Sequence, residues 1–236
     1  MNQNRFTLWY FLISIVFIVL ENTHVAIPAL IAKGLIIPSL MVFYHFEVRG
    51  NYGLFHRIIM TGLFFSWVGD VSLQLADGNL PFHFSGDKLF IVGLAAFLIT
   101  QLIYFVAFIL PKGKNLIFSS RLYQTILVLL FGTVMMYFLY RKLGDMRIPV
   151  IAYMVIILMM LLSALNRYGK VNGLSYILVV FGAILFVISD SLIAINRFQM
   201  KIDFAGILIM ITYVTAQYLI ILGCIRQNII SQKAEN

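Results

Sequence analysis

The stretch Leu174–Ile195 reads LSYILVVFGAILFVISDSLIAI, and Asp190 is its single charged residue. A transmembrane helix needs about 20 predominantly apolar residues, so this stretch can cross a bilayer. Other apolar runs of comparable length occur along the chain, and they lack the polar–apolar alternation of β-barrel strands. The sequence therefore predicts eight membrane spans: Phe6–Leu20, Val25–Tyr44, Ile58–Leu75, Leu89–Leu110, Leu122–Tyr140, Ile148–Leu165, Leu174–Ile195 and Phe204–Ile225.

The composition agrees with this prediction. Of the 236 residues, 62% are hydrophobic and 11% are charged, whereas soluble domains have about 45–50% and 25%. The net charge of +8 would suggest nucleic acid in a soluble protein. Here the basic residues lie mostly in short loops, where they set topology and meet anionic lipid headgroups. We expect an all-α, polytopic membrane bundle of eight transmembrane helices, forming a single transmembrane domain over residues 1–236 with membrane lipids, not nucleic acid, as partners.

The first apolar run is short for a span. Either it begins at Asn4 or Arg5, or it is a signal peptide, since a basic residue before an apolar core is typical of one. A membrane span is favoured, because no small-x-small cleavage site follows. Cys224 is the only cysteine, which excludes an intramolecular disulfide and a cysteine-based metal cluster.

The distribution of Lys and Arg predicts the orientation. With the N-terminus inside, ten of these residues lie on inner segments and six on outer ones. Basic residues favour the cytoplasmic side. Both termini are therefore expected in the cytoplasm, at the inner membrane if the protein is bacterial.

The chain contains an internal repeat. Gly62 precedes Asp70 by eight residues, and Gly182 precedes Asp190 by eight residues. In the next predicted span of each half, an aromatic residue stands four residues before a glutamine, as Phe97-x-x-x-Gln101 and Tyr213-x-x-x-Gln217. The offsets are 120 and 116 residues. A four-span unit returns to the same side of the membrane, so the pattern predicts two parallel four-helix repeats, residues 1–115 and 116–236.

Three ionisable residues lie inside predicted spans: Lys33, Asp70 and Asp190. Each costs at least about 2.5–3.5 kcal/mol on insertion scales, so such residues normally face the bundle interior and have partners. Counted from the span ends, these three and Tyr153 lie about 7–12 Å below the same membrane boundary. Gln101 and Tyr213 lie a little deeper.

This layer has two explanations. A Lys–Asp pair can simply lock helices together. Two aspartates with one lysine leave a surplus carboxylate, however, which can keep a proton near neutral pH and favours acid–base work or proton coupling. The histidines show no metal-ligand spacing, so we expect no metal site.

Gly34 and Pro38 lie close to Lys33 in the second span. Together they predict a kink that frees carbonyl groups, which a polar cavity in the bundle can satisfy. Trp67 is expected to face lipid or to pack.

Several motifs around these polar positions form a recognisable pattern. They are Gly69-Asp70-x-x-Leu73, Phe97-x-x-x-Gln101-x-x-Tyr104, Ser189-Asp190 with Asn196-Arg197-Phe198, and Tyr213-x-x-Ala216-Gln217. With these motifs the chain resembles the YhhN-like lysoplasmalogenase family, and the resemblance covers nearly its whole length. The usual Lys-Pro pair of span two is here Lys33-Gly34, and Gln101 stands where many members have histidine.

The resemblance implies an eight-span enzyme that hydrolyses the vinyl-ether bond of lysoplasmalogens, which are lysophospholipids. The products are a fatty aldehyde and glycerophosphoethanolamine or glycerophosphocholine, and no metal or organic cofactor is required. We expect Asp70 and Asp190 to divide the roles of acid and base. Lys33 would keep one aspartate ionised, and Gln101 and Tyr153 would orient water. The supporting residues are Tyr104, Ser189, Asn196, Arg197, Tyr213 and Gln217.

Two other functions fit the same residues. A proton-coupled transporter or a lipid-binding membrane protein can use the same carboxylates, since a parallel repeat with a polar middle layer suits that class. A structural membrane protein with a buried ion-pair lock is the third possibility.

Overall fold

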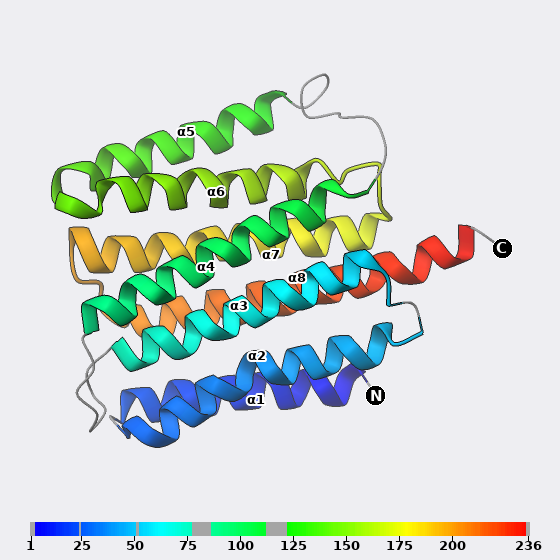
Figure 1. Cartoon of the computed structure of the whole chain (residues 1–236), viewed down its shortest axis with the longest axis horizontal. Coiled ribbons are helices and arrows are strands. Elements are labelled where there is room, and N and C mark those ends of the chain that lie inside the picture. The colour runs from blue at the N-terminus through cyan, green and yellow to red at the C-terminus, as the bar shows by residue number, and fades with distance from the viewer. Residues whose placement is uncertain (1–2, 24, 51, 77–85, 112–121, 235–236) are drawn as a thin grey trace. The chain divides into compact units, whose positions relative to one another are not determined.

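The computed structural model describes residues 3–23, 25–50, 52–76, 86–111 and 122–234 (Figure 1). Every regular element in these residues is helical, and eight helices are long and apolar enough to cross a membrane. The prediction of an all-α protein with eight spans is thereby confirmed. The helices are α1 (Gln3–Asn22), α2 (Ala26–Val48), α3 (Leu54–Ala76), α4 (Gly86–Ile109), α5 (Leu122–Leu139), η1 (Tyr140–Lys142), η2 (Gly144–Met146), α6 (Arg147–Leu165), α7 (Gly173–Ala194), η3 (Ile195–Gln199) and α8 (Ala205–Ala234).

The first helix is longer than predicted and reaches from Gln3 to Asn22. Its buried side chains recur every three or four residues, which gives it one packed face. On that face the Phe6 ring stacks on Phe43 of α2, with 4.0 Å between the ring centroids. Helix α1 therefore packs against α2 within unit 1, and its length and hydropathy suit a membrane span.

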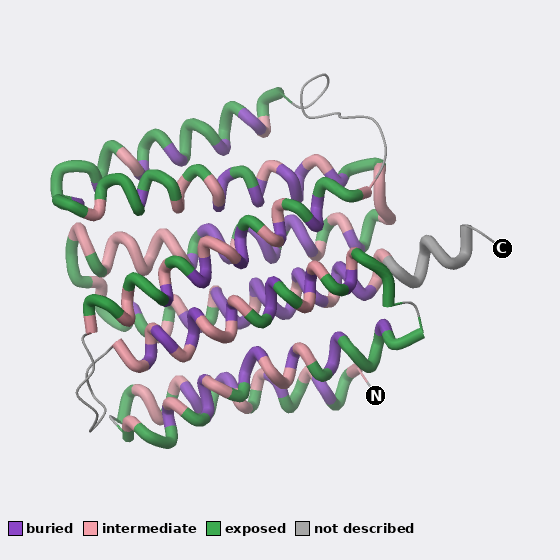
Figure 2. Tube along the Cα trace, viewed as in Figure 1, coloured by how far each residue is buried: buried purple, intermediate pink, exposed green. Residues whose placement is uncertain are grey.

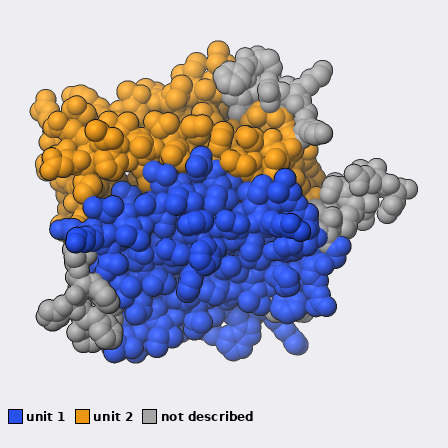
Figure 3. All heavy atoms as spheres, in the orientation of Figure 1, with its two compact units in different colours: residues 1–104 blue, residues 105–236 orange. Residues whose placement is uncertain are grey.

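The chain divides into two compact units, Met1–Tyr104 and Phe105–Asn236 (Figure 3). In unit 1, α2 packs against both α1 and α3; in unit 2, α5, α6, α7 and α8 pack in chain order. The division falls within α4 and precedes residue 115, the predicted repeat boundary. Within unit 2, exposed positions dominate α5, whereas more than half of the α8 span is buried (Figure 2).

Glycines bring the paired helices close together in each unit. A Cβ atom on Gly62 of α3 would lie 2.7 Å from Cε1 of Tyr104 in α4. A Cβ atom on Gly182 of α7 would lie 2.7 Å from Cγ1 of Ile220 in α8. Gly62 and Gly182 differ by 120 positions, and Tyr104 and Ile220 by 116. These are the offsets of the sequence repeat, and the duplication itself stays a prediction.

We expect Gly182→Ala to destabilise unit 2. The added methyl group would meet backbone atoms at 2.8 Å (Ala216 O) and 2.9 Å (Ile220 N), which cannot rotate away. Overpacking of this kind costs about 1–3 kcal/mol of unfolding free energy. Gly206→Ala is the matched control, because a Cβ there meets nothing within 4 Å. Thermal unfolding of both variants in detergent measures the difference, and equal stability of the two would refute the close approach of α7 and α8.

Pro38 lies inside α2, and the helix continues through it. Proline lacks the N–H that would bond the carbonyl four residues earlier, which is that of Gly34. The indole Nε1 of Trp67 in α3 donates to this freed carbonyl at 3.0 Å. A freed carbonyl beside Lys33 was predicted, but its partner is the Trp67 side chain, for which the sequence suggested only packing or lipid contact.

Candidate functional site

In unit 2, the structure brings Tyr153 and Asp190 together. Tyr153 comes from α6 and Asp190 from α7, and both are half-buried. The Tyr153 hydroxyl donates to Oδ2 of Asp190 at 2.5 Å. A short hydrogen bond to a carboxylate is a strong, charge-assisted interaction that fixes the carboxylate's position. The sequence placed these two residues at one depth, and the bond joins them directly.

The other predicted residues of unit 2 lie where α7 meets α8. The Ser189 hydroxyl is 1% exposed and donates to the Ile209 carbonyl at 3.2 Å. The Tyr213 ring packs edge-on against Phe186, with centroids 5.7 Å apart. Gln217 is fully buried one turn after Tyr213. These side chains hold the two helices in register beside Asp190.

Asn196 and Arg197 lie in the short π-helix η3 that follows α7. The Asn196 Oδ1 atom accepts a hydrogen bond from the Ile202 backbone N–H at 3.0 Å, and this bond holds the connection between η3 and α8. Arg197 is exposed. The structure therefore gives Asn196 a local structural contact and places Arg197 at an exposed position after α7.

In unit 1, Asp70 belongs to a buried polar stripe on α3. Ser66, Asp70 and Gln74 follow one another at intervals of four residues, so they lie on the same helix face. Their exposed fractions are 0%, 3% and 5%. The stripe leads from Asp70 toward the last turn of α3.

The α4 residues of the predicted site are Gln101 and Tyr104, and both are fully buried. Among the described residues, neither the nitrogen nor the oxygen of the Gln101 side chain has a hydrogen-bond partner. Buried amide groups normally find partners, and leaving one unpaired costs about 1–3 kcal/mol. Gln101 is thus suited to hold water or a ligand inside unit 1.

Lys33 is 8% exposed, and its ammonium lies 5.2 Å from the centroid of the Phe17 ring in α1. A second contact fixes the depth of this ring. The Gln74 side-chain nitrogen donates to Oε2 of Glu21 at 2.8 Å, which places the ends of α1 and α3 at one level. Phe17 lies one turn before Glu21, and Asp70 lies one turn before Gln74. These contacts put Lys33 and Asp70 at a similar depth in unit 1, and a shared functional layer stays a prediction.

Polar contacts of Glu21 and of Arg167 were among those that the sequence did not predict. The Glu21–Gln74 bond is one of them; the spacing of Gln74 four residues after Asp70 was the available signal. The other is Arg167, which is one of the ten basic residues counted on the inner segments but is fully buried. Its Nη2 atom donates to Ser175 Oγ at 2.9 Å and to Gln227 Oε1 at 2.7 Å.

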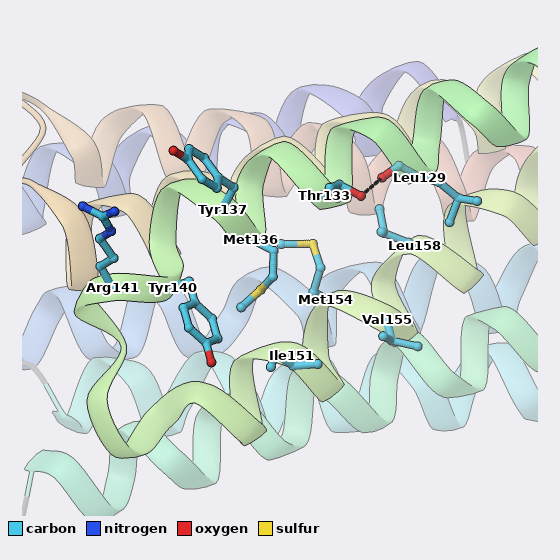
Figure 4. Close-up of a pocket in the computed structure, with 11 residues that line it drawn as sticks. Leu129, Thr133, Met136, Tyr137, Tyr140, Arg141, Ile151, Met154, Val155 and Leu158 are labelled. Atoms are coloured by element: carbon cyan, nitrogen blue, oxygen red, sulfur yellow. Dashed lines mark hydrogen bonds between the residues drawn. The ribbon is translucent and has the colours of Figure 1, made fainter.

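A groove of about 540 Å³ lies between α5 and α6 (Figure 4). Its walls are mostly apolar, with Arg141 at the end of α5. Ile151 and Val155 of α6 face this groove, whereas the nearby Tyr153 hydroxyl reaches Asp190 of α7. None of the predicted site residues lines it. The groove is therefore separate from the aspartate site and suits a hydrocarbon chain of the bilayer.

The chain is similar in sequence to one family of known proteins. The family model described as the YhhN family matches residues 29–224. The human protein lysoplasmalogenase TMEM86B is 31% identical over 172 residues, which covers 69% of this chain and 70% of that protein. The mouse protein of the same name is 30% identical over 178 residues, covering 71% and 72%. No solved structure matches the chain significantly.

Proposed function

Because the chain belongs to the YhhN family, we propose that it is a membrane hydrolase that cleaves the vinyl-ether bond of lysoplasmalogens. The observation that carries this proposal is the similarity to two proteins named lysoplasmalogenase, over more than two thirds of this chain. The substrate would be a lysophospholipid that reaches the protein from the membrane. The products would be a fatty aldehyde and a glycerophospho-headgroup.

The reaction needs two carboxyl groups in different states. A vinyl ether hydrolyses when an acid protonates its β-carbon, which gives an oxocarbenium ion at the adjacent carbon. A carboxylate stabilises this cation and takes a proton from the attacking water. The hemiacetal hydroxyl then gives up its proton, the C–O bond to glycerol breaks to leave the aldehyde, and the glycerol oxygen takes a proton and departs as a hydroxyl. Pairs of carboxyl groups in unlike surroundings divide such roles.

Asp70 and Asp190 are the proposed pair, and their surroundings differ. Asp190 is half-buried and accepts the Tyr153 hydrogen bond, an arrangement that suits the carboxylate acting on water. Asp70 is 3% exposed, lies on a stripe of polar side chains in the layer of Lys33, and would be the second carboxyl group of the reaction. In this proposal the buried amide of Gln101 orients water, and Lys33 balances the charge of the layer.

Purified protein should release fatty aldehyde from a defined 1-alkenyl lysophospholipid without any added metal or cofactor. The saturated 1-alkyl ether of the same chain length should give no aldehyde, because it lacks the carbon–carbon double bond that the acid protonates. Absence of aldehyde from correctly folded protein would sink the hydrolase proposal. Proton-driven lipid or solute uptake into liposomes by that same protein would then support the transporter alternative.

A further inference from the structure

Two hydrogen-bond acceptors meet where the ends of α1 and α3 approach each other. Gln74 uses its side-chain nitrogen to bond Glu21, so its Oε1 atom points away from that bond. This oxygen is buried and has no partner among the described residues, and Gln74 is 5% exposed. Glu21 contributes a half-buried carboxylate that forms no ion pair with any described residue.

The chemistry of this cluster selects a particular kind of ligand. A carboxylate accepts hydrogen bonds and donates none, and an amide oxygen does the same. A buried acceptor without a donor is unfavourable, and a buried carboxylate needs a positive partner. The ligand that satisfies both groups is a cation that carries N–H donors. A primary ammonium has three such donors in a compact head.

The cluster of Glu21 and Gln74 lies close to Asp70, one of the two proposed catalytic residues. Gln74 lies four residues after Asp70 on the same buried face of α3, about 6 Å along the helix axis. It also lies nearer the end of the span, where a lipid headgroup belongs. A lysoplasmalogen with its vinyl ether at Asp70 would direct its headgroup arm toward Glu21.

We propose that Glu21 and Gln74 form a subsite for the primary ammonium of an ethanolamine headgroup, an inference that rests on the proposed lysoplasmalogen hydrolysis. The ammonium donates one hydrogen bond to Gln74 Oε1 and another to the Glu21 carboxylate. Choline has a quaternary nitrogen without N–H and leaves the buried Gln74 oxygen unsatisfied. The subsite therefore favours phosphoethanolamine over phosphocholine substrates of the same chain length.

Glu21→Gln tests the subsite with the least disturbance. The glutamine carbonyl still accepts the hydrogen bond from Gln74, so the link between α1 and α3 is kept and only the negative charge is lost. We expect kcat/KM for the ethanolamine substrate to fall about tenfold or more, mainly through KM, because one charge-assisted hydrogen bond is lost. The choline substrate should change by less than about threefold, since it made no such bond. Glu47→Gln, at an exposed carboxylate near the end of α2, is the matched control and should change neither.

A binding measurement separates this inference from the hydrolysis. The uncleavable 1-alkyl lysophosphoethanolamine and lysophosphocholine are titrated into the full chain in a neutral detergent, for the wild type and both variants. Ethanolamine selectivity that Glu21→Gln removes supports the subsite even if no aldehyde is ever released, in which case the proposed hydrolysis fails alone. Equal affinity for both headgroups in the wild type overturns the subsite, whether or not aldehyde is released. An equal loss for both headgroups in Glu21→Gln overturns it as well, since that result assigns Glu21 a purely structural role.

Discussion

Replacing either Asp70 or Asp190 by asparagine is expected to lower the turnover of a lysoplasmalogen at least about a hundredfold, because positioned proton transfer typically contributes 10²–10⁴-fold. Asparagine keeps the volume of the side chain and can still hydrogen-bond. It can neither protonate the vinyl ether nor accept a proton from water. At position 190 the amide oxygen can still accept the Tyr153 hydroxyl, so the packing between α6 and α7 should persist. Aldehyde release from a 1-alkenyl lysophospholipid measures the effect.

Stability measured on the same variants separates catalysis from a structural role. If the aspartates only lock helices, the asparagine variants should unfold at lower temperature, and the protein that remains folded should keep its activity. The catalytic proposal expects the opposite pattern. Asp145→Asn is the matched control, because Asp145 is exposed in η2. Near-wild-type turnover in a folded Asp70 or Asp190 variant would rule out the two-aspartate mechanism.

The number and type of the helices could be predicted from the sequence because membrane insertion depends on hydropathy summed over about 20 residues. Helix ends were less predictable. Span one was placed at Phe6–Leu20, whereas α1 runs from Gln3 to Asn22. Polar residues such as Gln3 and Asn22 lower the hydropathy of the window but remain helical, because their side chains lie at the ends of the span. Hydropathy reports where the apolar core begins, and helical hydrogen bonding continues beyond it.

Counting along the spans predicted a shared depth for the polar residues, but the contacts inside each unit were not foreseeable. Counting at 1.5 Å per residue places Lys33 and Asp70 at one level without any knowledge of their neighbours. The bond from Tyr153 to Asp190 joins residues 37 positions apart, and the bond from Gln74 to Glu21 joins residues 53 positions apart. Such pairs depend on how helices rotate about their own axes. That rotation is set by side-chain packing along the whole helix, which a single sequence does not display.

Arg167 has a different structural role from the one that its position in the sequence suggests, because it is buried. It lies in the turn after α6, where a basic residue is expected to face the headgroups. Instead its guanidinium lies 5.2 Å from the centroid of the Phe108 ring and bonds Ser175 and Gln227. The Ser175 hydroxyl in turn donates a hydrogen bond to the Gly223 carbonyl of α8 at 2.7 Å. Arg167 therefore ties the turn between α6 and α7 to the C-terminal half of α8.

Arg167→Ala is expected to lower the free energy of unfolding by about 3–5 kcal/mol, because it removes two charge-assisted hydrogen bonds and opens a cavity. Arg167→Met separates these two causes. Methionine refills most of the volume and removes the cost of burying a charge, so its loss should be clearly smaller. Arg141→Ala is the control: Arg141 is an exposed arginine of unit 2, and truncating it should change stability by about 0.5 kcal/mol or less. Thermal unfolding in detergent ranks the three variants. If Arg167→Ala were as stable as Arg141→Ala, the buried guanidinium would contribute nothing to the fold, and its network would have to be explained by function.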